Sequence, residues 1–152
     1  MLDCRASGIL LHPTSLPSRF GIGDLWDRAY KFVDFLANSD QQIWQILPIG
    51  PTGYGNSPYL SYSALAGNPL LISPEVLHGQ ELLTTDELNS IPDFSLDEVD
   101  FDRVIASKIP LLRIASDRFK AQTSEVVDGE FKRFCDRQND WLSDYALFMS
   151  LK

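Results

Sequence analysis

Residues 50–59 and 12–17 carry side chains suited to binding a sugar, and both segments follow short apolar runs. Their sequences are GPTGYGNSPY and HPTSLP. The glycines and prolines of 50–59 predict a stiff, irregular backbone that presents Tyr54 and Tyr59 to solvent. The apolar face of a pyranose packs on an exposed aromatic ring, while Asn, Ser and Tyr groups hydrogen-bond its hydroxyls. This chemistry indicates a carbohydrate site, although residue types alone leave open that the two tyrosines only cover the strand ends.

The glycine-rich segment does not match a phosphate-binding loop. Such a loop places backbone N–H groups around an anion at the start of a helix. Here no Gly-Lys-Ser/Thr follows, and Asn56-Ser57-Pro58 stands where the helix would begin. A nucleotide site is therefore not expected.

Three residues at the expected strands are candidates for ligand contact or for packing. His12 directly follows the first apolar run. A lone His without a visible partner favours a hydrogen bond to a neighbouring backbone group over a ligand contact. Trp44 lies in the second apolar run and is expected to pack in the core, and Gln45 beside it needs a buried partner.

The carboxylates beyond residue 86 do not form a recognisable catalytic pair. They lie in a polar stretch, without the strand-end position expected of an acid or a nucleophile. Such a charge run is typical of a solvated face. The residues are Asp93, Asp97, Glu98, Asp100 and Asp102. No catalytic residue is predicted in this chain.

Composition and charge limit the partners of the chain. It has 152 residues, of which 44% are hydrophobic, enough for the core of one ordinary domain. The formal net charge of −8 opposes the phosphate neutralisation that nucleic-acid binding needs. No apolar run approaches the ~20 residues of a membrane span, and no export signal is visible. We expect a soluble protein with a neutral, polar small-molecule ligand.

The cysteines indicate neither a metal site nor a disulfide framework. Only Cys4 and Cys135 are present, far apart and without a nearby His cluster. Two free thiols suit a reducing cytoplasm. No metal or organic cofactor is indicated.

A strand, a helix and a second strand are expected to position the candidate loops. Brief apolar runs predict buried strands over residues 7–11 and 43–47. Asp24 is expected to cap a helix that continues to about residue 37. Two such strands around a helix predict a parallel crossover unit of an α/β sheet or barrel. The long loop 48–70 then lies at the carboxyl ends of the strands, where ligands bind in these folds.

Residues 73–152 show a different, mostly helical pattern. A short helix is predicted from Thr84, and a longer one is predicted after Asp102, which Pro110 kinks or restarts. Further helices are expected over residues 130–137 and 140–152. The longer helix is expected to run through Ile105, Ile109, Leu112 and Phe119. The chain stops inside an apolar-periodic helix without a Gly cap, which predicts a truncated protein.

Three stretches of the chain resemble the amylomaltase or disproportionating-enzyme family of 4-α-glucanotransferases. They are SGILLHPTSLPSRFGIGDL at 7–25, WQILPIGPTGYGNSPYLSYSALAGNPLLI at 44–72 and DWLSDYALFMSLK at 140–152. The combination of GPTGYGxSPY with SxxAGNP is specific, whereas residues 73–135 match less well. The resemblance implies an α/β fold, a TIM (β/α)₈ barrel. Residues 1–72 would supply its first two parallel strands and the crossover helix, and residues 73–152 a helical insertion.

The resemblance also implies an activity. Enzymes of this family transfer α-1,4-glucan segments between maltooligosaccharides in starch, glycogen or maltose metabolism, by a retaining double displacement. Their Asp nucleophile and Glu acid lie on later strands, so we expect the fragment alone to be inactive and to need the remainder of its own barrel. A non-catalytic α-glucan-binding module and an amylase-like glycoside hydrolase stay open as alternatives.

By motif, the resemblance assigns glucan contacts to the loop. Tyr59 is similar to the ring that stacks on the sugar at the cleavage site, and Ser57 to a hydrogen-bonding partner of bound glucan. Tyr54 resembles an aromatic of a second glucan groove. His12 and Asn56 complete the predicted substrate-binding residues.

The sequence departs from the family pattern at three places. Asn56 stands where an Asp is often found, and Leu60 stands where a Gln is usual. The partner ring of the second groove would fall near Ile105, which is not aromatic. The second groove is therefore expected to be incomplete.

Overall fold

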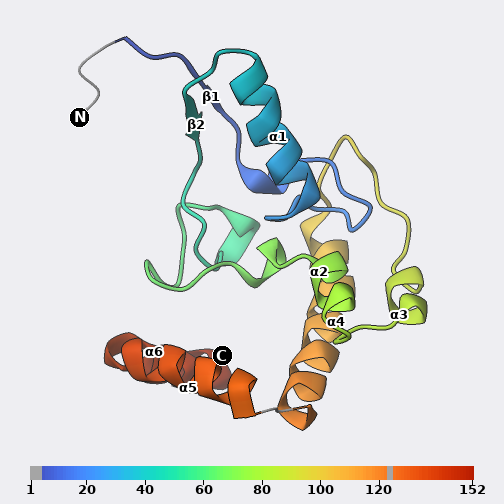
Figure 1. Ribbon diagram of the computed structural model, residues 1–152, viewed down its shortest axis with the longest axis vertical. Helices are drawn as coiled ribbons and strands as arrows, with labels where there is room; N and C mark the ends of the chain where they lie inside the picture. Colours follow the sequence, from blue (N-terminus) through green and yellow to red (C-terminus); the bar gives the residue numbers. More distant parts are fainter. Residues whose placement is uncertain (1–4, 123–124) are drawn as a thin grey trace.

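The computed structural model describes residues 5–122 and 125–152, with side chains of the second range described from residue 129. Cys4 lies outside the described residues. Strands β1 (Gly8–Leu10) and β2 (Ile43–Gln45) pair in parallel, with Ile9 opposite Trp44. Helix α1 (Asp27–Asn38) connects the strands and lies beside them (Figure 1). The predicted α/β class and the strand, helix, strand order are confirmed.

The strands are shorter and more exposed than predicted. Every residue of β1 is exposed, and Leu10 retains 57% of its accessible surface. The prediction of buried strands is wrong here because a sheet of two strands beside one helix leaves most apolar side chains without a neighbour. Gln45 is exposed as well and needs no buried partner.

Trp44 is half-buried and packs as predicted. Its ring meets Phe32 of α1 edge-on, with 5.0 Å between the ring centroids. Its Nε1 donates a hydrogen bond to the carbonyl oxygen of Leu11 at 2.7 Å. The side chain therefore joins the helix to the end of the first strand.

Helix α1 begins later than predicted. Its N-cap is Trp26, which makes no side-chain cap hydrogen bond, and Asp27 lies in the first turn. Asp24, the predicted cap, is only 7% exposed, and burial raises the pKa of its carboxyl despite the opposing charge of Lys108. The prediction is wrong because the helix starts at Asp27 with Trp26 at the cap, so Asp24 lies two residues before the cap position.

Residues 73–152 are mostly helical, as predicted. The helices are α2 (Pro74–Gly79), α3 (Thr85–Asn89), α4 (Phe101–Ala121), α5 (Glu125–Arg137) and α6 (Asn139–Leu151). Short 3₁₀ turns cover Pro13–Ser15, Tyr54–Asn56 and Pro69–Leu71. Helix α2 packs on α4 and on α3, while α5 and α6 pack on each other (Figure 1).

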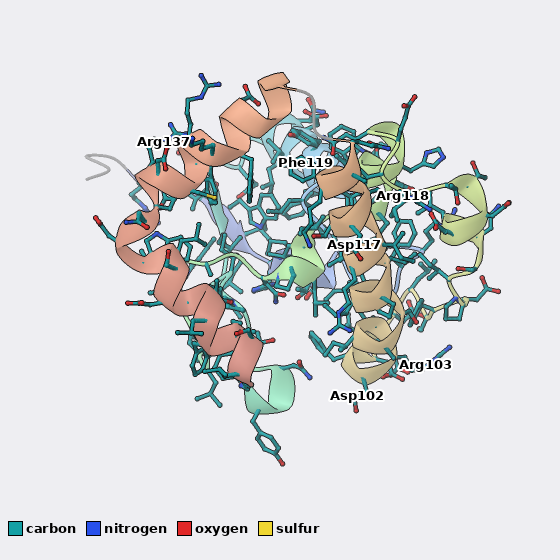
Figure 2. All side chains as sticks on the ribbon, turned by 90° about the horizontal axis from the view of Figure 1, so that it is seen from below. Asp102, Arg103, Asp117, Arg118, Phe119 and Arg137 are labelled. Carbon is teal, nitrogen blue, oxygen red and sulfur yellow. The ribbon has the colours of Figure 1, made fainter. Side chains whose placement is uncertain are left out.

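The start of α4 differs from the prediction. Asp100 is the cap, because its Oδ1 accepts a hydrogen bond from the backbone N–H of Arg103 at 3.1 Å. Asp102 lies in the first turn, next to Arg103 (Figure 2). Pro110 lies inside α4, which continues through it without a restart. The buried face consists of Val104, Lys108, Leu111 and Ala115.

Two clusters of buried apolar side chains lie along α4, and both combine residues from before and after residue 72. The first contains Phe20, Leu82, Leu83, Leu88, Leu111 and Ala115. The second contains Ile22, Leu70 and Val104. Phe20 and Ile22 belong to the segment between β1 and α1, so α4 packs directly on that segment.

A buried lysine connects α4 to the end of the loop that follows β2. Lys108 is 1% exposed, and its Nζ donates to the carbonyl oxygen of Leu70 at 2.6 Å. Burial lowers the pKa of Lys108 to about 8, and the carboxylate of Asp24 opposes this decrease. A buried ammonium group needs such polar partners, so this contact fixes the position of Leu70.

Glu87 combines a helix cap with an ion pair. Its carboxylate accepts from the backbone N–H of Thr84 at 2.8 Å, and its own N–H donates to Thr84 Oγ1 at 3.3 Å. This capping box confirms the helix start predicted at Thr84. Both carboxylate oxygens also accept from the guanidinium of Arg118, at 2.6 and 2.7 Å. The bidentate pair links α3 to α4.

We expect Glu87→Gln to destabilise the fold in a pH-dependent way. The hydrogen bonds from Arg118, then those from Thr84, lower the pKa of Glu87 from 4.5 to about 2. The stabilisation by the charge is therefore present above pH 4.5 and lost as the pH falls toward 2. Gln keeps the capping acceptor but removes the charge and one of the two oxygens that accept from Arg118.

Urea unfolding midpoints of the parent and of Glu87→Gln, measured from neutral to acidic pH, check this expectation. The gap between the two midpoints should close as the pH falls. Glu98→Gln, at an exposed position, is the control and should show no gap. A gap for Glu87→Gln that stays constant with pH would contradict the assignment.

Candidate functional site

The two candidate loops lie at the same edge of the sheet. Because β1 and β2 are parallel, their carboxyl ends point the same way, and residues 11–17 and 48–70 follow those ends. Figure 1 shows the chain leaving β2 directly into the loop that carries the Tyr54–Asn56 turn. The site is therefore built where ligands bind in α/β folds.

His12 joins the two loops. Its Nδ1 accepts hydrogen bonds from the backbone N–H and the hydroxyl of Thr14, at 3.2 and 2.9 Å. Because Nδ1 accepts, the proton of the neutral ring is on Nε2, which donates to the carbonyl oxygen of Pro48 at 3.3 Å. The structural role favoured by the sequence is confirmed, and a glucan contact by His12 stays a prediction.

The loop after β2 folds back on itself as a short hairpin. Thr52 and Ser61 form an antiparallel bridge, and the N–H of Gly53 donates to the carbonyl oxygen of Leu60 at 2.7 Å. At the tip, Gly55 and Asn56 both adopt positive φ angles, of 71° and 54°. The predicted stiff, irregular backbone is present, and its hydrogen bonds are made within the loop itself.

Both tyrosines of this hairpin face solvent, as predicted. Tyr54 is 93% exposed and Tyr59 is 72% exposed. Beside them Ser57 is half-buried, and its Oγ accepts from the N–H of Tyr59 at 3.3 Å. The Ser57 hydroxyl proton stays available to a ligand, because this hydrogen bond uses the oxygen as acceptor.

Tyr59 lines a groove of about 510 Å³. Besides Tyr59, the groove is lined by apolar residues and by Ser61 and Ser63. The structure thus brings Tyr59 to the groove, whereas Tyr54, Asn56, Ser57 and His12 do not line it. Sequence reasoning missed the two serines, and the only signal for them was their alternate spacing after Tyr59.

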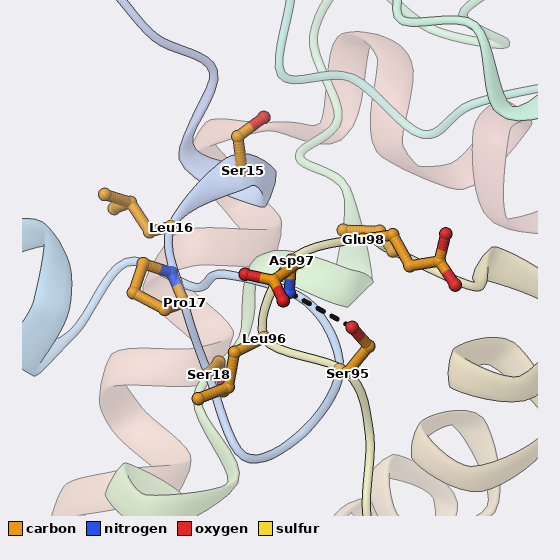
Figure 3. A pocket seen from close by; sticks show the side chains of 10 residues that line it. Ser15, Leu16, Pro17, Ser18, Ser95, Leu96, Asp97 and Glu98 are labelled. Carbon is orange, nitrogen blue, oxygen red and sulfur yellow. Dashed lines mark hydrogen bonds between the residues drawn. The ribbon is translucent and has the colours of Figure 1, made fainter.

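The predicted solvated carboxylates are exposed, which confirms that interpretation. Asp97 and Glu98 line a separate small cavity of about 170 Å³, between residues 15–21 and 95–99 (Figure 3). There the backbone N–H of Asp97 donates to Ser95 Oγ at 3.1 Å, and no other charged side chain lines this cavity. Within the described ranges, no group of three or more His, Cys, Asp or Glu side chains is placed to hold a metal ion.

Two structural findings bear on membrane and redox chemistry. Over the described part of the chain, no helix is both long enough and apolar enough to cross a bilayer. Cys135 is a free, half-buried thiol.

Comparison with known proteins gives consistent matches. The sequence pattern of the 4-alpha-glucanotransferase family matches residues 11–152. The 4-alpha-glucanotransferase of Synechocystis sp. is 57% identical over 152 residues, covering 100% of this chain and 30% of that protein. The Thermus thermophilus 4-alpha-glucanotransferase is 45% identical over 148 residues, covering 97% and 29%.

The fold is similar to part of a solved enzyme. The structure of amylomaltase from Streptococcus agalactiae in complex with acarbose matches with a TM-score of 0.88 and 38% identity. The match covers 98% of this chain and 30% of that chain. The chain thus spans about 30% of the length of the relatives it matches.

We expect the left-handed backbone at the hairpin tip to make Gly55 sensitive to substitution. A side chain at φ of 71° is strained although nothing lies within 4 Å, so Gly55→Ala should cost about 1–2 kcal/mol. Gly67 has equally open surroundings without a left-handed φ. Gly67→Ala is therefore the matched control and should be neutral or slightly stabilising. Free energies of unfolding in urea measure both, and equal values for the two variants would show the tip to be unstrained.

Proposed function

The chain belongs to the 4-alpha-glucanotransferase family, and we propose on that basis that the whole protein transfers α-1,4-glucan segments between maltooligosaccharides. The observation that carries the proposal for this chain is the Tyr59 ring, 72% exposed at the wall of a groove beside the carboxyl ends of the strands. A flat aromatic surface next to hydroxyl groups suits a neutral sugar.

The proposed architecture of the whole protein is a (β/α)₈ barrel. Strand β1, helix α1 and strand β2 are a parallel crossover unit, which is the repeating unit of such a barrel. The exposed apolar side chains of both strands, such as Leu10, fit positions that further barrel strands would cover. Residues 73–152 would then be a helical insertion beside the barrel.

The proposed reaction is a retaining double displacement. A carboxylate attacks the anomeric carbon of the donor glucan while an acid protonates the departing 4-oxygen. The resulting base then takes the proton from the 4-hydroxyl of an acceptor glucan, whose oxygen displaces the enzyme carboxylate. We assign both carboxyl groups to parts of the whole protein outside this chain. The chain's own contribution is to hold the sugar.

The loop residues have distinct proposed roles. Tyr59 stacks on a glucose ring near the reacting bond, and Ser57 donates a hydrogen bond to a sugar hydroxyl. Tyr54, at the tip of the hairpin, contacts more distant glucose units of long chains together with Asn56. His12 lies beside the bound glucan and holds the start of the loop through its hydrogen bond to Pro48. We place the activity in the cytoplasm, in line with the free thiol of Cys135.

In the full-length protein, Tyr59→Ala should lower kcat/KM for transfer on maltotriose by about tenfold or more, because it removes a stacking surface. Tyr59→Phe keeps the ring and should retain most of the activity. Tyr54→Ala should leave maltotriose transfer unchanged and reduce the use of long glucans. Product analysis by chromatography measures all three variants.

Two results would count against the proposal. Equal activity of Tyr59→Ala and the parent on maltotriose would remove Tyr59 from the site. Release of free glucose without redistribution of chain lengths would identify a hydrolase instead of a transferase.

A further inference from the structure

A second cavity lies between the same loop and α6. Its volume is about 400 Å³, within the roughly 300–1,000 Å³ of ordinary ligand sites. The loop contributes Tyr62 and Ser63. Helix α6 contributes Asp140, Trp141, Asp144, Tyr145 and Phe148. None of the α6 residues has a role in the proposed function described above.

The α6 side chains are brought together by helical spacing. Asp140 and Asp144 are four residues apart, as are Trp141 and Tyr145, so both pairs lie on one face. The Trp141 and Tyr145 rings are 6.0 Å apart between centroids at a tilt of 52°. The indole N–H donates to Gln138 Oε1 at 2.8 Å, which fixes the orientation of the Trp141 ring. The cavity therefore has an ordered aromatic wall.

The loop supplies the opposite wall. The Tyr62 ring lies 6.1 Å from that of Phe148 between centroids, and the ammonium group of Lys152 lies over Tyr62 at 3.0 Å from its centroid. One face of Tyr62 is thus already occupied. The surface left for a ligand ring is formed by Trp141 and Tyr145, which are half-buried in the described structure.

The polar groups of this cavity suit a ligand rich in hydroxyls. The carboxylates of Asp140 and Asp144 are exposed and, among the described residues, take part in no hydrogen bond or ion pair. A carboxylate accepts two hydrogen bonds from neighbouring hydroxyls of one sugar, whereas it repels phosphate and other anions. Aromatic rings beside such acceptors match the apolar face and the polar rim of a pyranose.

The second cavity and the groove at Tyr59 share one lining residue. Ser63 lines both of them, and Ser61 lines the groove two residues before it. The two cavities therefore neighbour each other on one loop. This proximity favours a long glucan, whose units could contact both, over an unrelated amine or peptide.

We propose that the cavity formed by Tyr62, Ser63 and the Asp140, Trp141, Asp144 and Tyr145 face of α6 is a further α-1,4-glucan subsite. It holds glucose units of a long chain at a distance from the unit on Tyr59. The inference rests on the proposed function for the identity of the ligand. Its binding chemistry requires only the residues named here.

The test is ¹⁹F NMR of the full-length protein labelled with 5-fluorotryptophan and titrated with maltoheptaose. Trp141→Phe assigns the Trp141 resonance. We expect this resonance to shift in a saturable way, while that of Trp26, at the start of α1, stays unchanged. No shift of the Trp141 resonance would overturn the proposal, including the case in which the rest of the protein covers this face.

Variants separate this subsite from the groove at Tyr59. The Trp141 shift should persist in Tyr59→Ala, and its loss there would overturn the proposal because Trp141 would then only report events at Tyr59. Tyr145→Ala should raise the Kd read from Trp141 about tenfold. Tyr30→Ala, at an exposed tyrosine of α1, is the matched control and should leave that Kd unchanged.

A milder variant covers the case in which Tyr145→Ala fails to fold. Asp144→Asn removes a charged acceptor at an exposed position and should also raise the Kd about tenfold. An unchanged Kd for Asp144→Asn would overturn the role of the carboxylates. A protein without transfer activity in which Trp141 still titrates would refute the proposed function and leave this subsite in place.

Discussion

Parallel pairing of β1 and β2 is the constraint on which the arrangement of the loops depends. It places both carboxyl ends at one edge, and the pairing continues into the loops because Leu11 N–H donates to the carbonyl oxygen of Gln45 at 3.0 Å. His12, the next residue, then reaches Pro48 on the other loop. An antiparallel pair would have separated these segments by the length of the strands. The position of the Tyr59 groove thus follows from strand direction before any side chain is considered.

Backbone hydrogen bonds hold the loop after β2 at its base and leave Tyr54 and Tyr59 exposed. Asn68 N–H donates to the carbonyl oxygen of Ile49 at 2.8 Å, which closes the loop, and Lys108 binds Leu70 just beyond this closure. Because these backbone hydrogen bonds hold the loop, packing of Tyr54 and Tyr59 is not needed to keep its shape. Because both rings stay exposed, the folded chain does not gain the free energy of burying them, about 1.5–3 kcal/mol for a large side chain. Their exposure is what the proposed stacking on glucose units requires.

Local sequence patterns predicted which helices and strands form, while tertiary contacts determined helix starts, strand burial and the cavity at α6. The apolar runs around residues 9 and 44 and the Thr84–Glu87 capping box are local signals, and the structure confirms both. The sequence pattern placed Asp24 at a helix cap. It could not show that Asp24 is buried near Lys108, which lies more than eighty positions away. Likewise, burial of the strands depends on neighbours that no pattern within a run specifies. The exposed tyrosines were predictable from the turn chemistry, but the cavity that Tyr62 shares with α6 was not, because it joins residues far apart in sequence.

The two sugar-sized cavities differ in what maintains them. The groove at Tyr59 lies within one loop whose backbone bonds are anchored to the strands. The cavity at Trp141 forms between that loop and α6, where the described ring contacts are those of Tyr62 with Phe148 and with Lys152. Side-chain contacts of this kind open at a lower cost than a hydrogen-bonded hairpin. A displacement of α6 would therefore alter the second cavity and leave the shape of the first intact, so the two can be perturbed independently although Ser63 lines both.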